Sequence, residues 1–388
     1  MVTDFKTSDK NSDLFDTLFT HFGKTINLAR IKFLSKIIKA IVVLGTVNFA
    51  KLATAFGGKA DTMSSMRRIQ RFMSGYDLDF SLVARFIFRL LPHKGPYVLS
   101  MDRTNWQFGA FDINALVLAV TYQGVAFPLL FRLLPKKGNS NTRERIDLME
   151  RYVALFGKAS IDCLVADREF VGKRWIGWLN GNRIPYHVRI RENFWVHKPS
   201  DGSRFKAFWT FQDLAVGESK CLHGIYLVNG QQCYLSAARM KNRNGKPELQ
   251  ILLSFNRPEE AVETYKSRWQ IETCFKSLKS SGFNVEDTHL ADIDRIERLF
   301  AILTIAFLWA YLVGIFKDRF IKPIRTLNNG RKAFSFFKYG LDEIASTLLN
   351  PDKQTDIDIF KFCHVLRYSL FAVLINGCIK HIKDLYLP

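Results

Sequence analysis

Four polar residues, Tyr265, Arg268, Glu272 and Lys279, follow the spacing Y-x2-R-x3-E-x6-K. On a helix with about 100° between residues, they fall within roughly 60° of one face. The separate apolar arc of this helix is suited to a core and holds Ile271, Cys274, Phe275 and Leu278. One carboxylate among cations and a phenol suits a divalent metal ion and phosphate groups. The spacing therefore predicts a helix that carries phosphoryl-transfer chemistry.

A simpler interpretation of the same residues is a solvated helix face. Arg268 and Glu272, and Glu272 and Lys276, are four residues apart, which is the spacing of ordinary surface ion pairs on helices. The choice between the two interpretations depends on the rest of the chain.

Two aspartates stand in otherwise apolar stretches that read as strands. Asp102 lies inside the first stretch, and Asp167 follows the buried-looking residues 163–166. A carboxylate on a buried strand costs several kcal/mol unless it is paired or bound to a metal. If the two strands are neighbours, Asp102, Asp167 and Glu272 form a set of catalytic carboxylates that holds two metal ions about 3.5–4 Å apart. Hard oxygen ligands select Mg²⁺, or Mn²⁺, over zinc.

Each aspartate also has a structural alternative. Asp102 could instead form an ion pair with Arg103 or cap a turn. Asp167 could form an ion pair with Arg168 or cap the next helix. Glu169 and Glu192 are weaker candidates for the third carboxylate.

The elements needed to position these residues form two blocks. From residue 96 onward, the order of apolar runs and helical patterns is β-β-β-α-β-α-β, which fits a mixed sheet flanked by helices. The expected elements are strands at 96–106, 113–123, 125–135, 161–170 and 185–193, and helices at 143–156 and 173–179. Residues 194–256 alternate short strand-like runs with Asx-Gly turn signals, which predicts an antiparallel β module. Its four strand-like runs are 205–211, 219–228, 231–240 and 250–255.

The N-terminal 90 residues read as helical and basic, in a chain of 388 residues with a net charge of +20. A folded protein this basic usually meets a polyanion, nucleic acid first. Residues 49–56 and 62–73 resemble a helix–turn–helix, with Thr62 as the cap of the second helix. We expect Arg67, Arg68 and Arg71 on that helix to contact DNA, although an ordinary helical hairpin with a basic face fits the pattern equally well.

An uncharged apolar run at residues 299–316 is long enough to cross a membrane, but we favour a buried core helix. The six cysteines include no C-x-x-C pair, which favours a reducing cytosol and argues against structural zinc. The N-terminus is polar and lacks a signal-peptide core. Gly23-Lys24-Thr25 imitates the end of a phosphate loop, but Leu18 stands where that loop requires glycine, so we expect no ATP site.

Together, the Y-x2-R-x3-E-x6-K signature, Asp102 and Asp167 make the chain resemble the IS4 family of DDE transposases over about residues 30–320. The resemblance implies a mixed α/β fold with an RNase H-like core and an inserted β module. It implies Asp102, Asp167 and Glu272 as catalytic and metal-binding residues, with two Mg²⁺ ions. It further implies that Tyr265, Arg268 and Lys279 bind DNA phosphates, and we expect Lys276 to do the same.

That family implies a cut-and-paste enzyme of bacterial insertion sequences, cytoplasmic and nucleoid-associated. Its partners would be double-stranded DNA, as terminal inverted repeats and target, and a second copy of the chain in a synaptic homodimer; neither a membrane nor ATP is expected. Relatives carry a late tryptophan in the β insertion for hairpin formation, whereas Trp195 and Trp209 come early here, so the hairpin step stays open. The alternatives are an RNase H-like nuclease without strand transfer and a catalytically decayed DNA-binding protein.

We expect five regions along the chain. They are a helical DNA-binding region at 1–90, the first part of the core at 91–193, the β insertion at 194–256, the helical second part of the core at 257–320 and a helical C-terminal region at 321–388.

Overall fold

The computed structural model describes residues 12–350 except 109–110, 243 and 329. The chain divides into two compact units. The sheet unit comprises residues 95–105 and 113–274, and the helical unit comprises the described parts of residues 1–94, 106–112 and 275–388. The expected helical region at 321–388 extends beyond the described residues from position 351.

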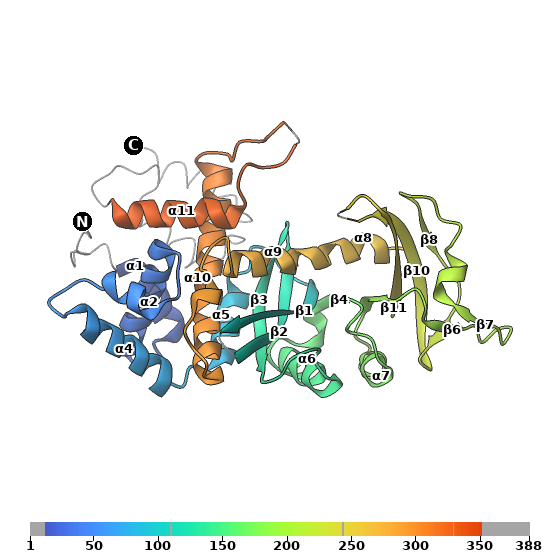
Figure 1. The fold of residues 1–388 in the computed structure, drawn as a ribbon, viewed down its shortest axis with the longest axis horizontal. Helices are drawn as coiled ribbons and strands as arrows, with labels where there is room; N and C mark the ends of the chain where they lie inside the picture. Colours follow the sequence, from blue (N-terminus) through green and yellow to red (C-terminus); the bar gives the residue numbers. More distant parts are fainter. Residues whose placement is uncertain (1–11, 109–110, 243, 329, 351–388) are drawn as a thin grey trace. The chain divides into compact units, whose positions relative to one another are not determined.

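The sheet unit is built on one mixed sheet in the strand order β3-β2-β1-β4-β5-β11-β10-β9-β6-β7, with β8 paired to β10 (Figure 1). β1 is parallel to β4, β4 is parallel to β5, and β2 and β3 are antiparallel. The first five strands are β1 (Tyr97–Phe108), β2 (Phe111–Tyr122), β3 (Val125–Leu134), β4 (Ile161–Ala166) and β5 (Tyr186–Ile190). The order 3-2-1-4-5 is that of an RNase H-like core, so the predicted mixed α/β fold class is confirmed.

Two helices connect strands within this unit, α6 (Thr142–Phe156) and α7 (Lys173–Gly181). Asn141 and Glu144 form a reciprocal capping box at the start of α6, which explains why the predicted helix begins where it does. β4 ends at Ala166, four residues before the end of the predicted strand. Asp167 therefore stands just beyond the carboxyl end of a central parallel strand, a position where functional side chains commonly gather.

The β module continues the same sheet. β11 pairs antiparallel with β5 and with β10, and Asn229-Gly230, both at positive φ, make the tight turn from β9 to β10. Its strands are β6 (Trp195–His197), β7 (Arg204–Lys206), β8 (Ser219–Cys221), β9 (Tyr226–Val228), β10 (Gln231–Lys241) and β11 (Pro247–Ser254). The expected strand at 205–211 is wrong beyond Lys206, because Ala207–Thr210 turn into a 3₁₀ helix.

The predicted signature helix is not one regular helix. It consists of α8 (Ala261–Tyr265), a 3₁₀ turn at Lys266–Arg268 and α9 (Trp269–Leu278). Its predicted apolar arc is confirmed, since Ile271, Cys274, Phe275 and Leu278 are all buried.

The helical unit contains α1 (Ser12–Phe22), α2 (Leu28–Leu44), α3 (Phe49–Thr54), α4 (Thr62–Gly75), α5 (Phe80–Arg89), α10 (Ile293–Phe320) and α11 (Phe336–Leu349). α3 and α4 are the two predicted helices of the helix–turn–helix. The predicted cap is wrong: the carboxylate of Asp61 accepts a hydrogen bond of 2.7 Å from the Ser64 amide, so the helix is capped one residue before Thr62.

Among the described residues, α10 alone is long and apolar enough to cross a membrane. Its most apolar stretch of 18 residues is completely buried in the structure. α11 packs closely across it (Figure 1). A Cβ atom at Gly314 would lie 1.8 Å from the Phe336 carbonyl oxygen, and one at Gly340 would lie 1.8 Å from that of Ala310. Such close backbone contact between helices confirms the prediction of a core helix.

Candidate active site

Asp102 and Asp167 are brought together by the parallel pairing of β1 and β4. Met101 is the register partner of Ala166, so the aspartate that follows each of them leaves its strand at the same edge of the sheet. Each carboxylate accepts a 2.7 Å hydrogen bond from the backbone amide of the next residue, Arg103 or Arg168. The side-by-side placement expected from the sequence is present.

Arg268 lies between Asp102 and Glu272. Its Nη1 is 3.4 Å from Oδ2 of Asp102, and its Nη2 donates a 2.8 Å hydrogen bond to Oε1 of Glu272. Only 5% of the Arg268 side chain is exposed, so this guanidinium is a buried positive charge shared by two carboxylates. The i,i+4 pair of the simpler interpretation exists, but it lies at the site and not on a solvated face.

Burial and neighbouring carboxylates disfavour the charged form of Asp102. Burial raises the pKa of Asp102 to about 6, and the negative charges of Glu169 and Asp167 add to that rise. The Arg103 amide and Arg268 act in the opposite direction without cancelling it. Such a site favours an additional cation.

Arg103 and Glu169 form a second ion pair that the sequence did not predict. Nε and Nη2 of Arg103 each donate a 2.7 Å hydrogen bond to one carboxylate oxygen of Glu169. Arg103 also binds the Asn114 side chain, the Gly138 carbonyl and the Asn139 side chain, at 3.1, 2.7 and 2.9 Å. The suggested pair between the Asp102 and Arg103 side chains is therefore wrong.

This pair ties the residue after Asp102 to the residue two positions after Asp167. The only sequence signal for it was that an arginine directly follows Asp102 and a glutamate stands two positions after Asp167.

Tyr265 is buried, with 1% of its surface exposed, and its ring packs in a cluster with Cys163, Val165, Leu252 and Ala261. Its hydroxyl donates a long hydrogen bond of 3.5 Å to Oδ1 of Asp167. Burial raises the pKa of the phenol well above its usual range, so it stays a neutral donor. Its predicted contact with a DNA phosphate stays a prediction, and the contact present here is with Asp167.

Lys276 and Lys279 belong to the helical unit. Lys276 is exposed, while Nζ of Lys279 is 3.2 Å from Oε1 of Glu286 and 6.0 Å from the centre of the Trp106 ring. Their phosphate-binding roles stay predictions. Arg67, Arg68 and Arg71 are exposed on α4 and line a groove in the same unit.

The donor atoms fit a hard divalent cation. Asp102, Asp167 and Glu272 offer carboxylate oxygens only, and two of them already contact one positive charge. Within the described residues, no three His, Cys, Asp or Glu side chains converge closely enough to hold an ion, because Arg268 stands between Glu272 and Asp102. An ion bound by all three residues requires these side chains to rearrange.

Comparison with known proteins places all three carboxylates inside one domain. Residues 94–309, more than half of the chain, match the family described as Transposase DDE domain. The chain is also similar to a solved structure, a piggyBac transposase synaptic complex with hairpin DNA, at 10% identity and a TM-score of 0.44, covering 94% of this chain and 83% of that one. No curated protein sequence matches significantly. DDE transposases carry out DNA transposition and use divalent metal ions. The chain belongs to the Transposase DDE domain family.

Proposed function

We propose that the protein is a cut-and-paste transposase of the IS4 type, which cleaves the ends of an insertion sequence and joins each 3′-OH to target DNA. One observation carries the proposal. The register of β1 and β4 places Asp102 beside Asp167, and Arg268 connects Asp102 to Glu272 of the signature helix. The three carboxylates predicted from the sequence thus lie in the sheet unit, two at adjacent strand ends and the third linked to them through Arg268.

In this proposal, Asp102, Asp167 and Glu272 hold two Mg²⁺ ions, with Mn²⁺ as a substitute. When bound, the ions activate the attacking water or 3′-OH and stabilise the leaving 3′ oxygen. The protein positions the ligands: two leave adjacent strand ends, and the third projects from a helix whose opposite arc is buried in the core.

Arg268 has a double role in this proposal. Its guanidinium supplies positive charge between Asp102 and Glu272 before the ions bind, and its planar fork then suits a DNA phosphate. The Tyr265 hydroxyl orients Asp167, and Lys276 and Lys279 neutralise phosphates of the bound end. Mutation of Arg268 should therefore affect both the apo site and DNA contact.

The five regions expected from the sequence remain our proposed functional division, with DNA binding in the first 90 residues and the β insertion between the second aspartate and the glutamate. We further propose that two copies assemble on paired DNA ends, in the bacterial cytoplasm and in association with the nucleoid. The net charge of +20 supports an encounter with DNA.

The test uses a plasmid that carries the DNA flanking the gene on both sides, a target plasmid and MgCl₂. We expect double-strand cleavage at the element ends and a joined product. Cleavage without joining would support an RNase H-like nuclease in place of a transposase. Binding of the flanking DNA without any cleavage in Mg²⁺ or Mn²⁺ would support a decayed enzyme.

A further inference from the structure

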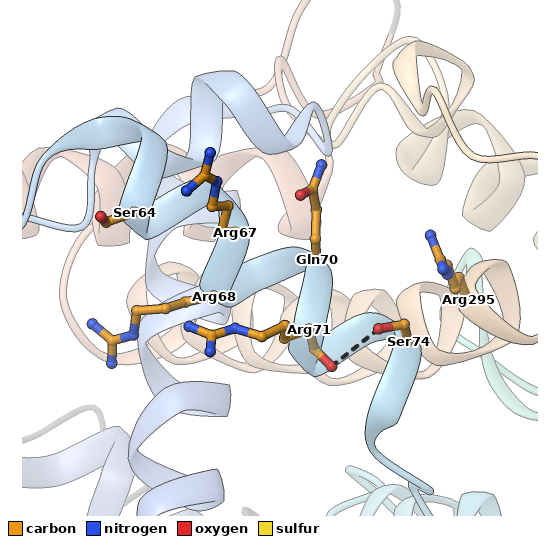
Figure 2. A pocket seen from close by; sticks show the side chains of 7 residues that line it. All are labelled: Ser64, Arg67, Arg68, Gln70, Arg71, Ser74 and Arg295. Carbon is orange, nitrogen blue, oxygen red and sulfur yellow. Dashed lines mark hydrogen bonds between the residues drawn. The ribbon is translucent and has the colours of Figure 1, made fainter.

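A basic groove runs along α4 in the helical unit. It is a hollow of about 720 Å³ lined by Ser64, Arg67, Arg68, Gln70, Arg71, Ser74 and Arg295 (Figure 2). Six of these residues come from α4, and Arg295 comes from the first turn of α10. The groove is therefore made by two helices that are more than 200 positions apart in the sequence.

The α4 residues of the groove form one helical stripe. Ser64, Arg67, Arg68, Arg71 and Ser74 fall within about 120° of one face at 100° per residue. The buried residues of α4 occupy the opposite face: Ser65, Ile69, Phe72 and Met73. Packing thus presents the arginines to solvent. From Ser64 to Ser74 the stripe is about 15 Å long at 1.5 Å per residue, which matches about four successive phosphates of one DNA strand along the duplex axis.

The charges of the groove are not compensated within it. No acidic side chain lines it, and within the described part of the chain none of the four guanidinium groups forms an ion pair. In Figure 2, Arg295 approaches from α10 at the opposite end of the groove from Ser64. Like charges gathered at a surface repel one another, and an anionic ligand relieves that repulsion.

A second groove on α4 shares two of the same arginines. Arg68 and Arg71 also line a hollow with Arg30, Phe33 and Tyr76. The guanidinium of Arg30 lies 4.4 Å from the Tyr76 ring centre, and that of Arg68 lies 5.3 Å from the Phe33 ring centre. These contacts hold the cations on aromatic faces while leaving their charge unneutralised. The basic surface is thus continuous around the exposed side of α4.

We propose that Arg295 and the α4 arginines form one binding site for the backbone phosphates of duplex DNA. The inference deepens the proposed function, on which its biological meaning rests, by adding a residue of α10 to DNA recognition. A guanidinium donates paired hydrogen bonds to phosphate oxygens, and such contacts carry no sequence information. The start of α10, fifteen residues after the signature helix ends at Leu278, would then help to hold DNA.

The experiment measures fluorescence anisotropy of two unrelated 40-bp duplexes, without divalent ions and over a series of salt concentrations. Arg295→Gln is compared with Arg295→Lys and with Arg85→Gln, a matched control that removes an exposed arginine of α5 outside the groove. Loss of one phosphate contact should reduce the slope of log K against log salt by about 0.9, which is about eightfold in affinity at 0.1 M salt.

We expect Arg295→Gln to show this loss equally on both duplexes, Arg295→Lys to bind within about twofold of wild type, and Arg85→Gln to bind like wild type. Equal binding and equal slopes for Arg295→Gln and Arg85→Gln would overturn the proposal. A loss confined to one duplex would also overturn it, because it would indicate base recognition. The assay needs no cleavage, so a protein that binds through the groove but never cuts would contradict only the proposed function.

Discussion

The carboxylate cluster of the sheet unit and the arginine groove of the helical unit differ in whether their charged side chains form ion pairs. In the cluster, Arg268 is shared by Asp102 and Glu272, and Arg103 is paired with Glu169. In the groove, the guanidinium groups of α4 and Arg295 form no ion pair within the described residues. Burial explains the difference, since a buried unpaired charge costs several kcal/mol whereas an exposed one is solvated and screened.

The comparison separates two kinds of function. Paired, buried charges keep a fixed geometry, which suits the chemistry of bond breaking. Exposed cationic side chains without ion pairs are suited to binding a polyanion. Substitutions in the cluster should therefore change reaction rate and stability, and those in the groove should change affinity and its salt dependence.

The largest effect is expected for Asp167→Asn. It removes a negative charge from the proposed metal site while keeping nearly the same shape, so the cleavage rate in Mg²⁺ should fall by about a thousandfold or more. DNA affinity measured by anisotropy should stay within about twofold of wild type. A cleavage rate within about tenfold of wild type would remove Asp167 from the site.

His187 tests the effect of burial on a titratable side chain outside the carboxylate cluster. It is buried, its Nδ1 lies 2.8 Å from the Ser254 hydroxyl, and burial lowers its pKa to about 4. The folded state binds its proton less readily than the unfolded state, whose pKa is about 6.5. The corresponding stability is thus complete above pH 6.5 and is lost as pH falls toward 4, by about 3 kcal/mol.

Denaturant unfolding of wild type and His187→Gln at several pH values checks this. The variant should lose less stability than wild type between pH 6.5 and 4. Parallel curves for the two proteins would show that His187 titrates equally in the folded and unfolded states.

Glu169→Gln should break the second ion pair of the cluster. The Arg103 and Glu169 side chains are only 16% and 20% exposed, so leaving Arg103 without its carboxylate should lower the free energy of unfolding by about 2 kcal/mol. The matched control is Glu263→Gln, whose carboxylate is 78% exposed beside Lys266 and should contribute less than about 1 kcal/mol.

Cleavage by Glu169→Gln should also slow at temperatures where the protein is folded, because Asp102 and Asp167 lose a tie between their strands. DNA affinity should not change. If Glu169→Gln and Glu263→Gln were equally stable and equally active, the Arg103–Glu169 pair would have no positioning role.

The smallest effect is expected in the groove. Arg71→Gln should weaken binding of any duplex by about eightfold at 0.1 M salt and reduce the salt slope by about 0.9, with cleavage at saturating DNA unchanged. Titration of DNA by anisotropy, followed by cleavage at saturation, measures both quantities. A fall in the saturated cleavage rate with no change in affinity would reverse the assignment of the two regions.

The sequence predicted those parts of the site that depend on local pattern. Asp102 and Asp167 stood out as carboxylates in apolar runs, and Arg268–Glu272 followed from helical spacing. Two features were not predictable in this way. The Arg103–Glu169 pair joins residues 66 positions apart and needs the register of β1 and β4, and the contact of Arg268 with Asp102 needs the packing of a helix on that sheet edge.

The wrong predictions about the fold concern the ends of helices and strands, where two local structures compete. β4 ends at Ala166, before the predicted limit, and the run after Lys206 forms a 3₁₀ turn in place of a strand. Asp61 caps α4 in place of Thr62, since both residue types suit that position and only the geometry of the preceding turn decides between them. Arg295 gave no sequence signal, because its neighbours in the groove are residues of α4.

The central claim is that Asp102 binds the metal ion that supports DNA cleavage, and Asp102→Cys tests it most directly. A thiolate is a soft ligand that binds Mg²⁺ poorly and Mn²⁺ better. We predict that the variant does not cleave the plasmid carrying the flanking DNA in Mg²⁺ and regains cleavage in Mn²⁺. Cleavage in Mg²⁺ at the wild-type rate would contradict the account.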